Sequence, residues 1–492
     1  MPMRAFASSL HAWKSLERQE GIKVPHGLVF SLAVVEAIGK PYGLTLTAEE
    51  HEPAGPAGYD AIMISVLDSR CMVETAQHFS SWKMPLRRVD RDDSYPLVIA
   101  GGQGLHNPLP YAPIADVIVI GDAEEPLPAL LMAYQSASNR ARFLELASCI
   151  DGVFVPSLHD RTKVVIKQAV SQDISITTTN HISVSNDGSR RIEIARGCQY
   201  KCGFCSLGWR TPVRENPPDV VISAIKKSGK RVHLQAGDAE SHSGINEIRQ
   251  ALRSHGGSDQ GWTGRLDSLF ENPDQTIPGQ KRYAFGVEGV SYRLRRAVGK
   301  GYLTDDRLVS DTMRFFNAIE GEGKGRAAWH VIAGLPGERP EEATDLGLVV
   351  RRIDEARRGK RARNLSIHWQ PFQPLPGTPM QWCAAGRGAR HLSAVLAPIV
   401  ERLPYVPVRQ IGGRTDAMAL LCSVLARSDE RGADLLEAMG HGPVSVKQAE
   451  AIAGTTIGAL DPYAPLPWDF IQTSFAKEVL LKAYNVMMDR LK

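Results

Sequence analysis

Short apolar runs rich in isoleucine and valine alternate with longer amphipathic segments along most of this chain. In the first part the runs are YDAIMISVL (59–67), PLVIAGGQG (96–104) and ADVIVIGDAEE (115–125). A strand that is apolar on both faces is typical of a parallel sheet, because helices cover both sides of such sheets. The alternation therefore predicts an α/β fold. Residues 1–180 form its first unit, and the glycines after its strands fall where open sheets usually bind ligands.

The same alternation continues over residues 181–410, where predicted helices separate six further strand candidates. Six strands separated by helices predict a full or partial β/α barrel, whose active site lies at the C-terminal ends of the strands. Residues 411–492 contain long amphipathic segments and are expected to be mainly helical. The six strand candidates are RRIEIARG (190–197), KRVHLQAGD (230–238), GWTGRLDSL (261–269), RYAFGVEG (282–289), AAWHVIAGLPG (327–337) and NLSIHWQPFQPLPG (364–377).

The composition is ordinary for a globular protein. The 492 residues are 43% hydrophobic and 23% charged, and a net charge of +4 is too small to predict nucleic-acid binding by itself. The N-terminal segment has no continuous apolar core and the chain has no run of about 18 apolar residues, so we expect neither a secretory signal nor a membrane span. Four of the seven cysteines (Cys71, Cys149, Cys383 and Cys422) are scattered, which argues against a disulfide framework and favours a reducing cytoplasm.

The other three cysteines are crowded into RGCQYKCGFCSLGWR (196–210), directly after the first strand candidate of the predicted barrel. A closed zinc site takes four ligands, often as two C-x2-C pairs, and this sequence has no second pair. A distant fourth ligand such as His233 or Cys383 stays open as an alternative.

An iron–sulfur cluster accounts better for three ligands. Cys198, Cys202 and Cys205 on three corners of a [4Fe–4S] cube leave one iron without a protein ligand, and an open position is the mark of a catalytic metal. Gly197 and Gly203 would let the backbone turn tightly around the cube. The sequence therefore predicts a catalytic cluster at the mouth of a barrel.

The pattern Cys198-x3-Cys202-x-Phe204-Cys205 resembles the signature of the radical S-adenosylmethionine (SAM) superfamily. The resemblance implies that SAM binds the open iron. An electron from a reductant such as flavodoxin or ferredoxin would then cleave SAM to methionine and a 5′-deoxyadenosyl radical, which abstracts hydrogen from a substrate carbon. The protein places and shields these cofactors, whereas the radical chemistry belongs to them.

Further segments resemble one branch of that superfamily, which often carries a cobalamin-binding N-terminal domain. The resemblance implies a Rossmann-like, cobalamin-binding-type domain over 1–180, a partial (β/α)6 radical SAM barrel over 181–410, and a helical C-terminal region over 411–492. The segments are LVIAGGQGLHNPLPYAPIADVIVIGDAEEPLPALL (97–131), FGVEGVSYRLRRAVGKG (285–301), VIAGLPGERPEE (331–342), PFQPLPGTPM (371–380) and LPWDFIQTSFAKEVLLKAYNVM (466–487).

The resemblance also implies cofactor-binding residues. HLQAGDAES (233–241) resembles the segment that meets the SAM amino group, with Asp238 and Glu240 as candidates, although the usual Gly-Gly-Glu is absent. Arg265 and Asp267 lie two residues apart on one strand face, and Arg265 could bind a carboxylate in bidentate fashion. For these residues a solvated strand end is the alternative. The other candidates are Phe204 beside the cluster, Glu288 toward ribose or methionine, Ser291 and Arg295 after it, and Gly334, Leu335 and Pro336 along the adenine.

The cobalt-ligating motif of base-off cobalamin proteins, D-x-H-x-x-G, is absent from this sequence. His11, His26 and His51 do not fit its spacing, and Gln103 stands where the branch often has proline. A domain can keep its fold after changing its function, so cobalamin binding stays open. The strand-end glycines, Gly121 among them, are equally compatible with purely structural turns.

Three functions are open from the sequence. The radical could lead to rearrangement or another modification, cobalamin could deliver a methyl group, or the protein could be an iron–sulfur electron carrier or scaffold. The missing histidine motif favours the first, and carriers usually have every iron ligated by protein. The substrate could be a nucleobase in DNA or RNA, a peptide or a small molecule. Basic segments at 293–300 and 351–363 favour nucleic acid only weakly, because the second is typical of a solvated helix face.

Overall fold

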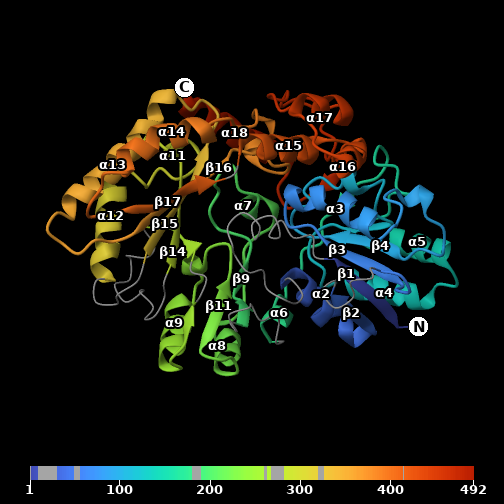
Figure 1. Ribbon diagram of the computed structural model, residues 1–492. Coiled ribbons are helices and arrows are strands. Elements are labelled where there is room, and N and C mark those ends of the chain that lie inside the picture. Colours follow the sequence, from blue (N-terminus) through green and yellow to red (C-terminus); the bar gives the residue numbers. More distant parts are fainter. Residues whose placement is uncertain are drawn as a thin grey trace. The chain divides into compact units, whose positions relative to one another are not determined.

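The computed structural model divides the chain into two compact units, each described separately below (Figure 1). Unit 1 comprises Met1–Arg191, Leu421–Ile457 and Tyr463–Ala476, and unit 2 comprises Ile192–Leu420, Gly458–Pro462 and Lys477–Lys492. The C-terminal segments are thus shared between the units, and the three-part division expected from the sequence remains a prediction. The structure describes residues 2–8, 30–48, 56–179, 190–259, 263–266, 282–319, 326–413 and 415–492.

Unit 1 is built on a six-stranded sheet in the order β2-β1-β3-β4-β5-β6, in which β6 alone runs antiparallel. Both faces of this sheet are apolar. Along β3, Ile62 and Ile64 belong to one core cluster, whereas Ala61 and Met63 belong to another on the opposite face. The strands are β1 (Met3–Ser8), β2 (Leu44–Ala48), β3 (Ala61–Ser65), β4 (Leu97–Gly101), β5 (Val117–Val119) and β6 (Val153–Phe154).

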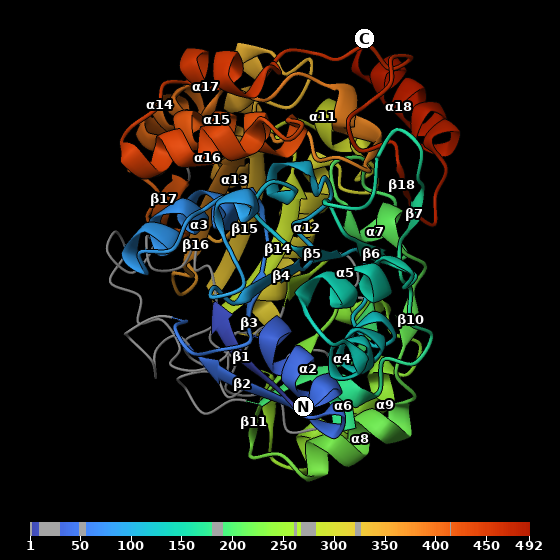
Figure 2. The ribbon, with the colours of Figure 1, turned by 90° about the vertical axis from the view of Figure 1, so that its right-hand side faces the viewer.

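Helices cover both faces of the unit 1 sheet, which is why its strands are apolar on both sides. One core cluster includes residues of α2, α4 and α5, and the other includes residues of α3, α15, α16 and α17 (Figure 2). A short pairing of β7 (Ile166–Lys167) with β18 (Ile471–Gln472) adds a later segment to the unit. The helices are α2 (Phe30–Gly39), α3 (Ser69–Ser81), α4 (Pro126–Ser136), α5 (Arg140–Ser148), α6 (Ile176–Thr179), α15 (Asp416–Arg427), α16 (Gly432–His441) and α17 (Val446–Ala453).

Unit 2 contains a three-stranded sheet in the order β12-β11-β8, in which β11 and β12 run parallel, and a parallel sheet in the order β13-β14-β15-β16-β17. Every strand candidate expected from the sequence in this region has a counterpart here, so the predicted α/β fold is confirmed. The strands are β8 (Arg190–Glu193), β11 (Arg231–Gln235), β12 (Ser258–Asp259), β13 (Thr263–Gly264), β14 (Arg282–Glu288), β15 (Arg326–Ala333), β16 (Leu365–Pro371) and β17 (Val408–Gly413), with the short antiparallel pair β9 (Ala195–Arg196) and β10 (Arg214–Glu215) beside them.

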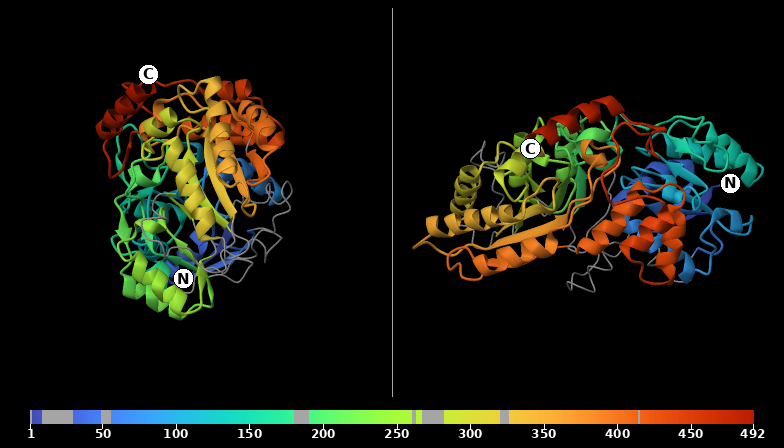
Figure 3. Two further views of the ribbon diagram at one scale, coloured as in Figure 1. Left: turned by 90° about the vertical axis from the view of Figure 1, so that its left-hand side faces the viewer. Right: turned by 90° about the horizontal axis from the view of Figure 1, so that it is seen from above.

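Helices cover the outer face of the five-stranded sheet of unit 2 (Figure 3). Phe315 of α12 meets Tyr283 and Phe285 of β14 edge to face, with ring centroids 4.9 and 5.3 Å apart. Because side chains alternate along a strand, Gly286 then points to the inner face, and the register carries His330 and His368 to the same face. The helices of this unit are α7 (Leu207–Arg210), α8 (Pro218–Lys226), α9 (Ile245–Ser254), α11 (Tyr292–Ala297), α12 (Asp305–Ala318), α13 (Ala343–Ala356), α14 (Ala389–Val400) and α18 (Lys477–Leu491).

Helix α18 belongs to unit 2 although it is the last element of the chain. Its Tyr484 ring packs edge-on against Trp382, and the carbonyl of Leu491 accepts a 2.6 Å hydrogen bond from Arg293. These contacts fix α18 over α11 and over the turn that follows β16. Across the part of the chain that the structure describes, no helix is long and apolar enough to cross a membrane.

Candidate iron–sulfur and cofactor site

The three clustered cysteines lie in a single loop of unit 2, between β9 and α7. Cys202 is buried, whereas Cys198 and Cys205 are partly exposed. Gly197, which opens the loop, has φ 82°, and a Cβ there would lie 2.7 Å from the carbonyl oxygen of Pro212. A glycine is therefore required where the chain leaves β9.

Later segments of unit 2 hold the middle of this loop in place. The Gly203 N–H donates to the carbonyl of Val298, and the Gly203 carbonyl accepts from the N–H of Met380, both at 3.2 Å. A Cβ on Gly203 would lie 2.2 Å from the sulfur of Met487 in α18. The cysteine loop is thus bound to the end of α11, to the P-G-T-P turn after β16 and to α18.

The electrostatic setting of the three thiols suits metal coordination rather than nucleophilic catalysis. Burial raises the pKa of Cys198 and Cys202, and it raises the pKa of Cys205 to about 12. A nucleophilic cysteine needs the opposite shift, because only the thiolate attacks. A coordinated metal, by contrast, deprotonates a buried thiol outright.

A zinc site completed by a distant ligand is not supported. Across the described ranges, no group of three or more His, Cys, Asp or Glu side chains is placed to hold a metal ion, and His233 and Cys383 both lie in those ranges. A single ion needs ligands that converge on one point. A cube places each thiolate on a separate iron, so its cysteines need no such convergence.

Glu288 and Lys300 form a charged pair beside the cysteine loop. The Lys300 Nζ lies 3.6 Å from Glu288 Oε1 and donates to the Gly286 carbonyl at 3.3 Å. Burial lowers the pKa of Lys300, but Glu288, Tyr302 and Cys202 together more than offset this effect and leave that pKa above its ordinary value. Lys300 in turn lowers the pKa of Cys202 against the larger effect of burial, so its ammonium acts directly on the loop.

Glu288 has a strained backbone. Its φ is 67°, and among the described non-glycine residues only Lys83 shares a positive φ. Such strain persists where surrounding contacts enforce it, and it is concentrated at functional sites. Sequence reasoning selected Glu288 but not Lys300, which stands in the same motif as the lysine of the closing K-G and could have been selected from it.

The segment that contains Asp238 and Glu240 packs directly on the start of the cysteine loop. A Cβ on Gly237 would lie 2.6 Å from the Gly197 carbonyl oxygen and 3.3 Å from the Cys198 Cβ. Asp238 is buried and raises the pKa of the Cys198 thiol further beyond the effect of burial. Glu240 is also buried, but its carboxylate is paired with Arg249. The structure thus brings Asp238 to the loop and gives Glu240 a partner elsewhere.

Arg265 is enclosed by two tyrosines. Its guanidinium carbon lies 4.0 Å from the ring centroid of Tyr200 and 3.6 Å from that of Tyr302. Tyr200 belongs to the cysteine loop, so this cation–π arrangement links the end of β13 to the loop. Asp267, predicted together with Arg265, lies outside the described residues.

Ser291 and Arg295 have extensive partners within the protein. The Ser291 hydroxyl accepts from the Leu294 N–H at the start of α11 and donates to Glu342 Oε1 at 2.7 Å. The fully buried Arg295 donates to the carbonyls of Leu303 and Gly289 and pairs with Asp305, so both side chains fix the chain after β14. Their contact with a cofactor remains a prediction.

The turn Gly334–Pro336 is fixed by a neighbouring carboxylate. Glu338 Oε2 accepts from the N–H groups of Gly334 and Leu335, at 2.9 and 3.1 Å. Burial raises the pKa of Glu338 to about 7. The two N–H groups therefore already have a partner.

Phe204, the remaining candidate, lies in the cysteine loop and is partly exposed.

In unit 1 the glycine turns after the strands are filled by the chain itself. A Cβ on Gly102 (φ 115°) would lie 2.5 Å from the Val66 carbonyl oxygen, and one on Gly121 (φ 107°) would lie 2.1 Å from that of Ala169. These glycines allow close packing of backbone on backbone, so the turns do not show an open cradle for cobalamin. His11, His26 and His51 lie outside the described residues.

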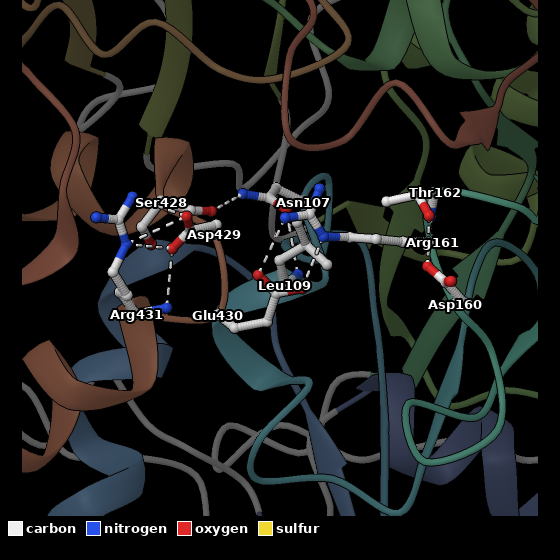
Figure 4. Close-up of polar contacts among 9 residues, drawn as sticks. All are labelled: Asn107, Leu109, Asp160, Arg161, Thr162, Ser428, Asp429, Glu430 and Arg431. Atoms are coloured by element: carbon white, nitrogen blue, oxygen red, sulfur yellow. Dashed lines mark hydrogen bonds and ion pairs between the residues drawn. The ribbon is translucent and has the colours of Figure 1, made fainter.

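A cavity of about 390 Å³ lies at another edge of the unit 1 sheet. Much of its lining comes from segments that precede β4 and β5 or follow the antiparallel β6, which places it at the amino ends of the parallel strands. Arg161 spans it to Glu430 at 2.7 Å, and nearby Asn107 donates to the Ser428 carbonyl at 2.6 Å (Figure 4). Ligands of open α/β sheets bind at the carboxyl ends instead, so this cavity is not at the expected cofactor position.

Comparison with known proteins agrees with this architecture. Residues 36–156 match the family described as radical SAM proteins, N-terminal. No curated protein matches the sequence.

Two solved structures share the fold. The radical SAM methyltransferase TsrM from Kitasatospora setae, with cobalamin and a [4Fe–4S] cluster bound, aligns with a TM-score of 0.51 at 15% identity, over 78% of this chain and 74% of that one. The cobalamin-dependent SAM radical enzyme OxsB, with aqua-cobalamin bound, aligns with a TM-score of 0.50 at 13% identity, over 72% of this chain and 52% of that one. Residues 36–156 thus match a family of radical SAM N-terminal regions, and the chain shares its fold with two radical SAM enzymes solved with cobalamin bound.

Proposed function

We propose that this chain is a radical SAM enzyme that cleaves SAM reductively and abstracts hydrogen from a substrate carbon, leading to rearrangement or another modification. The observation that carries the proposal is one loop with three cysteines, fixed between the Asp238 segment and the Glu288–Lys300 pair. A [4Fe–4S] cluster on Cys198, Cys202 and Cys205, with SAM at its open iron, would supply the radical chemistry.

The residues of the loop hold and shelter this centre. Hydrogen bonds through Gly203 keep the peptide between the cysteines fixed, which lowers the conformational entropy that cluster binding would cost. The Lys300 ammonium, close to Cys202, offsets part of the negative charge that three thiolates bring into a buried site. The burial of Cys202 excludes water from one side.

Several side chains suit the parts of SAM. Asp238 places a buried carboxylate next to Cys198, which suits the ammonium of the methionine moiety. Glu288 could accept from that ammonium or from ribose hydroxyls. Glu338 fixes the Gly334–Pro336 turn, whose apolar surface would lie along the adenine. Arg265, between its two tyrosines, would support the loop rather than bind a carboxylate alone.

A second candidate is cobalamin-dependent methyl transfer. The fold likeness to TsrM and OxsB, both solved with cobalamin bound, favours it. The glycine turns of unit 1 and the missing histidine motif favour hydrogen abstraction without cobalamin. Titration with cobalamin, followed by its absorption spectrum and by a search for methylated product, separates the two: absence of both leaves the first.

Anaerobic incubation of the reconstituted protein with SAM and dithionite tests the proposal. We expect 5′-deoxyadenosine and methionine in equal amounts by mass spectrometry, increased by the right substrate. A flavodoxin or ferredoxin should replace dithionite. A protein that holds its cluster but forms no 5′-deoxyadenosine, with candidate nucleic acids, peptides and small molecules present, would be an electron carrier or scaffold.

A nucleobase in DNA or RNA is one substrate hypothesis, on the basis of the basic segments at 293–300 and 351–363. Retention on heparin or DNA that is lost at modest salt would support it, since phosphate contacts release counterions. Absence of binding at low salt would exclude nucleic acid as a polymer and leave small molecules and peptides.

A further inference from the structure

Two stacked histidines stand in the middle of the inner face of the unit 2 sheet. The register aligns Gly286, His330, His368 and Gly412 across β14, β15, β16 and β17. The imidazole rings of His330 and His368 have centroids 5.5 Å apart and planes 22° apart, and both residues are partly exposed. Covered parallel strands are normally apolar on both faces, so this polar pair calls for a functional explanation.

The Glu288–Lys300 pair lies against Gly286, which is aligned with His330 and His368 across the strands. A Cβ on Gly286 would lie 3.1 Å from Lys300 Nζ and 2.3 Å from Glu288 Oε1, so the missing side chain makes room for both groups. Gly286 is the β14 partner of His330. The histidines therefore adjoin the pair that acts on the cysteine loop, and a molecule on this face would lie next to the proposed radical centre.

A buried hydroxyl without a hydrogen-bond partner lies on the same strand as His368. Ser366 is 1% exposed, and its Oγ has no hydrogen-bond partner. It precedes His368 by two residues on β16 and so points to the same face. A buried hydroxyl is costly to leave unsatisfied, so this one indicates a place for a polar ligand atom.

We propose that His330, His368 and Ser366 form a substrate-binding floor for a molecule with an anionic oxygen group, a carboxylate or a phosphate. The inference rests on the proposed function, because it assigns the substrate side of that same site. Imidazole, hydroxyl and ammonium groups are all hydrogen-bond donors to such oxygens. The only carboxylate that the described residues of β14, β15 and β16 place on this face is Glu288, which Lys300 engages.

Calorimetric titration of the full-length, cluster-loaded protein with sodium phosphate and, separately, with sodium acetate tests this floor at constant ionic strength. We expect saturable binding of one of the two, which identifies the anionic group. His330→Asn and His368→Asn should each weaken that binding about tenfold, as expected for one lost hydrogen bond to a charged group. Ser366→Ala should weaken it too, and because this substitution removes no hydrogen bond within the protein, we expect the variant to fold.

His255→Asn is the matched control. His255 lies at the C-terminal end of α9, where its imidazole contacts the Ser228 carbonyl, and it belongs to no strand of the sheet. Binding of neither anion, or binding that all three floor variants leave unchanged, would overturn the proposal. Formation of 5′-deoxyadenosine by the wild-type protein is measured in parallel. If 5′-deoxyadenosine forms but neither anion binds, the proposed anion site is wrong and the proposed function stands. If no 5′-deoxyadenosine forms, the proposed function is wrong.

Discussion

Units 1 and 2 are both parallel α/β assemblies, yet they use the ends of their strands differently. In unit 1, glycines after the strands bring one stretch of backbone against another, as Gly121 does with Ala169. In unit 2, the strand ends gather cysteines, a strained Glu288 and a charged Lys300. The comparison teaches that a glycine turn at the carboxyl end of a strand marks a close approach, while the residues beside it decide whether a ligand or the chain itself comes close.

The sharpest contrast is expected at the cysteines. Cys202→Ser should abolish the cluster absorbance and with it SAM cleavage, since a cube held by two thiolates loses the geometry that leaves one iron open. Cys149→Ser, an exposed cysteine of unit 1, is the control and should change neither. Iron content and 5′-deoxyadenosine are the measurements. A cluster of normal iron content in the Cys202 variant would refute the ligand assignment.

Loss of the Lys300 ammonium should be the next largest effect. Lys300→Met leaves the partly buried Glu288 carboxylate without its partner, and breaking such a pair costs at most about 3 kcal/mol. Chemical unfolding gives the free energy of unfolding of Lys300→Met and of the control Lys226→Met, which replaces an exposed lysine. Equal stability of the two variants would show that the pair contributes little and that the strain at Glu288 has another cause.

Gly121→Ala tests the contrasting claim for unit 1. Its Cβ would meet the Ala169 carbonyl oxygen at 2.1 Å and its φ is 107°, so we expect about 2 kcal/mol of destabilisation or more. Gly58→Ala isolates the backbone term, because Gly58 also has a positive φ of 81° but open space around it. A thermal unfolding scan compares them. If Gly121→Ala behaves like Gly58→Ala, the turn has room that a ligand could use.

The smallest effect concerns pH and the turn at Gly334. The pKa of Glu338 is raised to about 7 in the folded state, so the folded protein binds a proton that the unfolded chain has lost above its ordinary value of 4.5. Stability from this group is therefore complete at acidic pH and declines as pH rises through 7, by on the order of 1–2 kcal/mol. Glu338→Gln should flatten this part of the stability curve between pH 5 and 8 by about that amount. An unchanged slope would mean that the carboxylate ionises freely.

Much of the fold was predictable because apolar runs mark buried parallel strands, and the cysteine triplet marks its own chemistry by spacing. The histidine floor was not predictable, since it depends on which residues of β15 and β16 stand opposite each other. Lys300 stands twelve positions after Glu288, and only the turn of α11 brings the two together. Ser291 and Arg295 illustrate the converse: their motif is visible in sequence, but whether a polar side chain faces a cofactor or its own loop depends on packing.

The contact between Gly203 and Met487 has a consequence for biosynthesis. The cysteine loop is translated early, but α18, which packs over it, is translated last among the elements of unit 2. At ordinary elongation rates the interval between the two is on the order of tens of seconds. During that time the cysteine loop lacks its contact with Met487 of α18. The loop therefore reaches its final packing only when the last helix of unit 2 has docked on it.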